Sequence, residues 1–336
     1  MLIGYGYNIF DIPGVLKSRP AALGDAFRFL SPSAGGGGNF LPGSGLMYAD
    51  DIATNLATED IALQLIGDTQ LAINRPIVEV QTYLRSVSDP AIEVASVYHG
   101  FNREDGRSWI GFHDGVSNIP SHQRWKAIEI KTAGWTEGGT YKTFIRLGVN
   151  LEAWEQVSVL RQNNVVGRDK NTGCPVTGVD LVGNPVAASG CPVAGSGDIF
   201  DPANSNFKEP TAPMLGDIKI IRSHVQRANN AHSTDWASKS SLRVYRQGYE
   251  FLETLSTPSR IEVGLNFICF QDHPERIFRV LTQDGWLGAT NFGGEINQQN
   301  PDIGLRQLLT VRAAGNFLIP PIDLSGELPG KIIFTQ

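Results

Sequence analysis

Strand-like and helix-like patterns alternate along this chain, and that alternation is what most constrains its fold. Residues 60–66 alternate apolar and polar positions as a half-buried strand does. Residues 69–87 carry apolar side chains near helical spacing, with Pro76 in an early turn or at a kink, and residues 92–99 predict another strand. Because the glycine fingerprint of dinucleotide-binding folds is absent, the pattern predicts an α+β protein.

The second half repeats the alternation. Residues 141–149 predict a strand, and Asn150 is a suitable N-cap for a helix over residues 151–162. Residues 261–270 predict a strongly apolar strand, and residues 274–283 a helix that begins with proline. Both halves therefore predict antiparallel sheets with flanking helices.

At 336 residues the chain is long enough for two domains. We expect them at residues 1–135 and 136–336, with the boundary in a glycine-containing stretch. Residues 169–216 are rich in Gly, Pro, Ala, Ser and Asn, which predicts a long loop. From about residue 293 an irregular tail is expected to run to the C-terminus.

Composition narrows the classes of function. The net charge of −6 argues against a nucleic-acid-binding protein, which would usually present a basic face. No apolar run has the length to cross a bilayer, and no basic-then-apolar leader opens the sequence. These features predict no nucleic-acid or membrane partner and a cytoplasmic location, and they are compatible with a homo-oligomer.

The three cysteines do not form a disulfide framework, because their number is small and odd. Cys269 lies in an apolar run and is expected to be a buried thiol. Cys174 and Cys191 occupy near-repeats of the form Gly-Cys-Pro-Val. A disulfide or a shared metal is open to this pair, and free loop thiols are the favoured interpretation.

The segment most suggestive of chemistry is GFHDGVSN, residues 111–118, in which Asp114 stands before one glycine and three residues after another. Glycines allow the backbone to turn sharply and to approach a bulky ligand. A carboxylate held in such a turn can act as a proton carrier. An isolated motif of this kind is more often a surface turn, so its meaning depends on the segments that accompany it. His113 is expected to point away from the site.

Three later segments carry further candidates: His224 and Arg227 in the first, Arg246 in the second, and Leu265 and Phe267 in the third. Taken in this order with the glycine-flanked acid, they resemble the dye-decolorizing peroxidase family of haem enzymes. The acidic segment matches that family's G-x-x-D-G signature. The resemblance implies two ferredoxin-like domains of the dimeric α+β barrel type, with haem b (iron protoporphyrin IX) held mainly by the C-terminal one.

The resemblance also implies a role for each candidate. His224 is the expected axial ligand of the haem iron, because a neutral imidazole is an electron-donating base. Asp114 is the expected shuttle that moves a proton between the peroxide oxygens, and Arg246 the cation that stabilises developing charge. Cofactor-binding roles are expected for Arg227, facing a haem propionate, and for Leu265 and Phe267, walling the distal pocket.

The function implied is a haem-dependent peroxidase that reduces hydrogen peroxide through a ferryl intermediate and oxidises dyes or phenolic compounds. Because a carboxyl group titrates roughly two units below imidazole, turnover is expected to be fastest at acidic pH. Two alternatives stay open: a haem-binding or haem-trafficking protein with incidental peroxidase activity, and a ligand-binding module without haem. The pairing of Asp114 with Arg246 favours the enzyme, because carriage alone would not need it.

Overall fold

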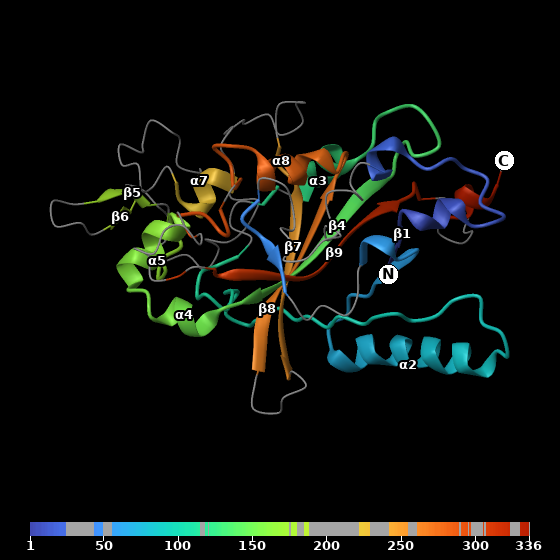
Figure 1. Cartoon of the computed structure of the whole chain (residues 1–336), viewed down its shortest axis with the longest axis horizontal. Coiled ribbons are helices and arrows are strands. Elements are labelled where there is room, and N and C mark those ends of the chain that lie inside the picture. The colour runs from blue at the N-terminus through green and yellow to red at the C-terminus, as the bar shows by residue number, and fades with distance from the viewer. Residues whose placement is uncertain are drawn as a thin grey trace.

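The computed structural model is built on one curved sheet with helices on both faces (Figure 1). It describes residues 1–24, 44–49, 56–114, 118–119, 121–174, 176–179, 185–187, 222–228, 242–254, 261–288, 290–294, 296, 305, 307–322 and 330–335. The strands in these ranges are β1 (Leu2–Tyr5), β2 (Met47–Tyr48), β3 (Ile61–Gln64), β4 (Thr140–Val149), β5 (Val176–Val179), β6 (Pro185–Ala187), β7 (Tyr245–Thr254), β8 (Ile261–Gln271) and β9 (Leu309–Ile319). The helices are α2 (Gln70–Ser86), α3 (Ser121–Ile128), α4 (Leu151–Glu155), α5 (Val159–Val166), α7 (His224–Ala228) and α8 (Glu275–Thr282), with 3₁₀ turns at Asn8–Asp11, Leu56–Thr58 and Lys331–Phe334.

The main sheet has the strand order β3-β1-β9-β4-β8-β7, and β2 pairs with β9 beside this path. Every described pair is antiparallel except the short pairing of β2 with β9. β4 lies at the centre and pairs along its length with β8 and β9. The predicted α+β class, with an antiparallel sheet and flanking helices, is confirmed.

Alternate residues of β8 pack against different helices. Cys269 packs with Ile277 of α8, whereas its neighbour Ile268 packs with Ile128 of α3. Because successive side chains of a strand point to opposite faces, α8 and α3 cover opposite sides of the sheet. We call these sides the α8 face and the α3 face. Arg246 lies opposite Cys269 in the register of β7 and β8, so it belongs to the α8 face.

The sheet curves toward closure. β3 and β7 stand at opposite ends of the strand order, yet the Gln64 amide of β3 donates to the Gln247 side chain of β7 at 3.0 Å. Gln247 lies opposite Ile268 and therefore on the α3 face. Side chains from the two edges meet on this face, so it is the inner side of a barrel-like sheet.

Strands from both predicted domains share this one sheet. β1, β2 and β3 come from residues 1–135, and the other strands of the main sheet come from residues 136–336. β1 and β2 reach the rest through β9, which pairs with both. The division into two ferredoxin-like domains stays a prediction.

The predicted irregular tail is wrong, because β9 lies within it. Residues 309–319 form an eleven-residue strand between β1 and β4. Its last seven residues are all buried, so side chains on both faces are covered. A strand buried on both faces lacks the apolar-polar alternation of a half-exposed one, and this one also carries Ala313, Ala314 and Gly315 in its middle.

The strand predicted at residues 92–99 is also wrong. This segment has no ladder with any described strand, and its apolar residues Ile92, Val94 and Val97 remain exposed. It reaches the sheet only at its end. There Asn266 donates its side-chain amide to the His99 carbonyl at 2.8 Å, and Phe101 pairs with Glu250 at the edge of β7.

The single helix predicted over residues 151–162 is two helices. Asn150 caps α4 as predicted, accepting from the Ala153 amide at 3.1 Å. The chain then breaks because Ser158 caps a second helix, α5, and such a side chain competes with the helix for backbone donors. Gln162 stabilises the break by donating to the carbonyls of Trp154 and Val157 at 2.9 and 3.0 Å.

Helix α2 lies at the surface of the molecule (Figure 1). Thr69 caps it by accepting from the Ala72 amide at 3.2 Å, and Pro76 lies inside the helix. None of its residues is buried. None of the described helices is both long and apolar enough to span a membrane.

The cysteines differ in part from expectation. Cys269 is a buried free thiol, as predicted. Cys174 is disulfide-bonded, so the expectation of a free thiol there is wrong. Within the predicted loop 169–216, β5 and β6 form a two-stranded sheet. Cys191 lies outside the described residues.

Arg146 gives a test of the fold. Its side chain is 2% exposed, forms a salt bridge with Glu253 and donates to the Asn266 side chain at 2.6 Å. We expect Arg146→Ala to lower the free energy of unfolding in urea by about 3 kcal/mol, because the network loses its buried cation. Arg75→Ala, which breaks an exposed pair with Glu79, is the control and should cost less than about 1 kcal/mol. Equal losses would contradict the structure.

Candidate functional site

The acidic segment is fastened to β7 on both sides of Asp114. Before Asp114, the Trp109 amide donates to the Glu250 carboxylate at 3.3 Å, and its indole donates to the Phe251 carbonyl at 3.0 Å. After it, the Asn118 side chain donates to the Arg246 carbonyl at 2.6 Å and accepts from the Arg246 amide at 3.1 Å. These bonds place Asp114 beside a defined stretch of one strand.

Asp114 lies over Gly248, which has room for it only because it is glycine. A Cβ atom at position 248 would overlap the Oδ2 atom of Asp114 and would lie 3.2 Å from Cδ1 of Leu265. Arg246 precedes this glycine by two residues, and so lies on the same face of the strand. The Asp114 carboxylate and Arg246 thus lie on the same face of β7, the α8 face. None of the described residues forms a salt bridge or hydrogen bond with the Arg246 guanidinium.

His224 begins α7, and its imidazole is fixed by a backbone carbonyl. Its Nδ1 lies 2.6 Å from the Phe292 carbonyl oxygen, and the two rings stack with centroids 4.1 Å apart. Gly293 makes this approach possible, because a Cβ there would lie 2.6 Å from the His224 Cα. A carbonyl can only accept, so Nδ1 carries the proton and Nε2 keeps its lone pair.

The charges of Asp114 and Arg246 act on His224. Burial, together with the charges of Arg246 and Arg168, lowers the pKa of His224 to about 4, whereas the Phe292 hydrogen bond and Asp114 act in the opposite direction. The imidazole is therefore neutral at pH 7. Because Asp114 and Arg246 both shift this pKa, they lie within electrostatic reach of His224. His224, Asp114 and Arg246, the candidates for iron ligand, proton carrier and cation, therefore lie in the same region of the structure.

The remaining candidates lie near this group. Leu265 contacts the position of Gly248 and so stands beside the Asp114 carboxylate. Phe267 follows on the same face and packs against the core under α8. Arg227 is one turn beyond His224 on α7 and donates to the Trp286 carbonyl at 2.6 Å, while its Nε is buried with no partner among the described residues. Its predicted role toward a propionate stays a prediction.

Sequence reasoning missed two charged residues of the site. Arg168 is buried, donates to the Gly173 carbonyl at 3.0 Å, and its charge reaches His224. Glu250 is 6% exposed and lies on the α8 face, two residues beyond Gly248. The sequence could have indicated Glu250, because it follows Arg246 and Gly248 at every second position and therefore shares their face of the strand.

The donor set fits a haem. A haem iron needs a neutral imidazole whose other nitrogen is held by an acceptor, and His224 with the Phe292 carbonyl supplies both. In the described part of the chain, no group of three His, Cys, Asp or Glu side chains could hold a bare metal ion.

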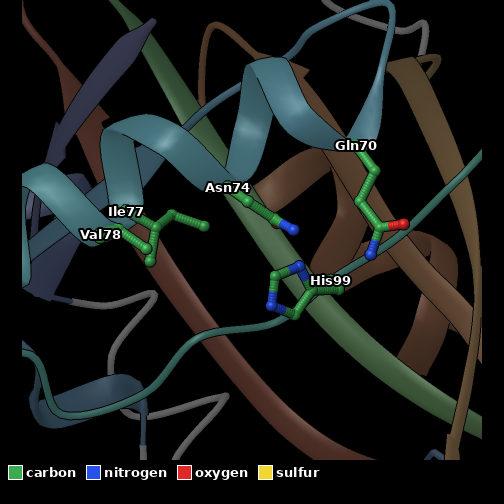
Figure 2. Close-up of a pocket in the computed structure, with 5 residues that line it drawn as sticks. All are labelled: Gln70, Asn74, Ile77, Val78 and His99. Atoms are coloured by element: carbon green, nitrogen blue, oxygen red, sulfur yellow. The ribbon is translucent and has the colours of Figure 1, made fainter.

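A cavity of about 270 Å³ lies elsewhere, between α2 and the end of the 92–99 segment (Figure 2). Gln70, Asn74, Ile77, Val78 and His99 line it, and the lining surface is almost entirely apolar. In Figure 2 the His99 ring lies below the Asn74 side chain, and the Gln70 side chain lies to the right of both. No predicted site residue lines this cavity.

Comparison with known proteins gives consistent results. A family model described as Dyp-type peroxidase, C-terminal, matches residues 105–323. Deferrochelatase from Shigella flexneri is 23% identical over 245 residues, as is that of Escherichia coli strain K12, covering 68% of this chain and 51% of the relative. The chain thus spans about half the length of these curated relatives.

Solved structures resemble the fold over nearly the whole chain. Ferric DtpA from Streptomyces lividans is 20% identical with a TM-score of 0.64, covering 99% of this chain and 77% of that one. A DyP-type peroxidase from Cellulomonas bogoriensis is 17% identical with a TM-score of 0.63, covering 100% of this chain and 78% of that one. At these identities the likeness establishes the fold.

Replacing Gly248 tests the placement of Asp114. We expect Gly248→Ala to displace the Asp114 carboxylate at a cost of about 1 kcal/mol in stability, because a side-chain end can rotate away. The ¹³C-carboxyl resonance of Asp114 should move. Gly264→Ala is the matched control, since its Cβ would overlap the Leu147 carbonyl oxygen, and it should cost about 3 kcal/mol in thermal unfolding. An unmoved Asp114 resonance in Gly248→Ala would refute the placement.

Proposed function

Because the chain belongs to the Dyp-type peroxidase family, we propose that it is a haem-dependent peroxidase that reduces hydrogen peroxide and oxidises dyes or phenolic compounds. The observation that carries this proposal is the gathering of Asp114 and Arg246 within electrostatic reach of His224. A neutral imidazole, a carboxylate and a guanidinium can supply the three functions that peroxide cleavage at a haem needs, namely an axial ligand, a proton carrier and a fixed positive charge.

The proposed cofactor is haem b. His224 would hold its iron through Nε2, because Nδ1 is committed to the Phe292 carbonyl. Leu265 and Phe267 would wall the distal side, and Arg227 would face a propionate. When bound, the haem supplies the iron centre at which peroxide is reduced.

The protein's own groups would handle protons and charge. Asp114 would accept a proton from one peroxide oxygen and deliver it to the other, so that this oxygen can leave as water. Arg246 would stabilise negative charge as the O–O bond breaks, because a guanidinium stays charged at any working pH. Phe292 would hold the imidazole in one orientation throughout.

A haem-handling role is the second candidate. It is favoured by the curated relatives, which are named deferrochelatases. The pairing of Asp114 with Arg246 favours the peroxidase, because retention of a haem by His224 would not need a proton carrier on the same strand face as a cation. Comparing turnover with the rate of haem loss separates the two functions.

Two substitutions test the assigned roles. We expect His224→Ala to lose the Soret band or to hold haem loosely, because the axial imidazole is gone. Asp114→Asn should retain the Soret band but react with one equivalent of peroxide at least about 100-fold more slowly, the usual loss for a missing proton carrier. Stopped-flow absorption measures both. Normal peroxide reactivity in Asp114→Asn would refute its role.

The pH dependence gives an independent test. A carboxyl group accepts protons at lower pH than an imidazole, so an enzyme with an acidic shuttle should oxidise dyes fastest at acidic pH. Steady-state dye oxidation across pH, with the Soret band followed in parallel, measures this. A maximum at neutral or alkaline pH with haem still bound would overturn the assignment.

A further inference from the structure

Glu250 is a second carboxyl group beside the proposed proton carrier. It follows Gly248 by two residues on β7, and Gly248 is the residue over which Asp114 lies. Alternate residues of a strand are about 7 Å apart on one face, so the two carboxyl groups are neighbours. Leu265, opposite Glu250 on β8, is apolar and offers it no counter-ion.

The surroundings of Glu250 favour its protonated form. Burial, helped by the charge of Asp114, raises the pKa of Glu250 to about 7, although the hydrogen bond from the Trp109 amide acts in the opposite direction. Two outer residues also act on it: Arg103 lowers the pKa and Asp105 raises it. A carboxyl group placed in this way holds a proton at pH values where ordinary carboxyl groups have lost theirs.

Glu250 is 6% exposed, whereas its neighbour Asp114 is exposed. Asp105 is exposed, Arg103 is partly exposed, and the charges of both act on Glu250. Asp114 acts on it from the site. The buried Glu250 therefore responds to the charges of two loop residues, Arg103 and Asp105, as well as to that of Asp114.

We propose that Glu250 donates protons to Asp114 during turnover. This rests on the proposed peroxidase function, in which one H₂O₂, two protons and two electrons become two H₂O. In each transfer the Glu250 carboxyl O–H bond breaks and an O–H bond forms on the Asp114 carboxylate. Solvent then reprotonates Glu250 at the Arg103 and Asp105 end. The reducing substrate supplies the electrons.

The haem-free protein provides the first test. With ¹³C-carboxyl labels on Asp and Glu, the resonance that disappears in Glu250→Gln should titrate near neutral pH in the wild type. Asp114→Asn removes a neighbouring negative charge, so the Glu250 midpoint should fall. Glu104→Gln removes an exposed carboxylate from the same loop and should leave the midpoint unchanged. A Glu250 midpoint that Asp114→Asn does not move would overturn the proposal.

The haem-loaded protein provides the second test. Ferrocyanide gives electrons without protons, whereas phenol brings a proton with each electron. Glu250→Gln keeps an acceptor for the Trp109 amide but cannot donate an acidic proton, so turnover with ferrocyanide should fall roughly tenfold or more and that with phenol much less. Wild-type turnover with ferrocyanide should fall as pH rises through about 7, where Glu250 loses its proton, and Glu250→Gln should lack this step. A variant that keeps both the rate and the step would overturn the proposal.

The two tests separate the inference from the function beneath it. A wild type that carries haem but does not reduce peroxide overturns the peroxidase function and with it any donor role, even where the two carboxyl groups are coupled in the haem-free protein. An active peroxidase in which Glu250 and Asp114 titrate independently overturns the role of Glu250 alone.

Discussion

The hydrogen bonds that attach Trp109 and Asn118, on either side of Asp114, to the edge strand β7 are the constraint on which the site depends. Asn118 satisfies both backbone groups of Arg246, in the way that another strand would, and Trp109 donates twice to the same strand. Without these bonds Asp114 would be a carboxylate in a mobile turn. These bonds hold Asp114 over Gly248, two residues along β7 from Arg246. Because side chains alternate along a strand, every second side chain of β7 then points to the same site.

The opposite half of the site depends on backbone atoms. The Phe292 carbonyl fixes which nitrogen of His224 bears the proton, and Gly293 lets that segment approach closely enough. Burial then keeps the imidazole neutral. A half-buried neutral histidine whose Nδ1 is held by a carbonyl keeps its Nε2 lone pair available, and this is the property that a haem ligand needs.

Much of this could be predicted from sequence, and what could not has physical reasons. Asp114, His224 and Arg246 could be proposed from sequence because their chemistry lies in the side chain and their order along the chain is distinctive. The Phe292 carbonyl could not be found, because any residue supplies a carbonyl and this one is 68 positions from its partner. Strand β9 was not predicted because burial on both faces removes the alternation of apolar and polar residues. The helix break at Ser158 was not predicted because the apolar pattern continues through it, although the Ser158 hydroxyl caps a new helix there.

The most direct test of the account is a crystal structure of the haem-loaded protein. It should place Nε2 of His224 on the iron, with Nδ1 still bonded to the Phe292 carbonyl, and both the Asp114 carboxylate and the Arg246 guanidinium above the other porphyrin face. A haem held by another residue, or either distal group on the His224 side or remote from the iron, would contradict it.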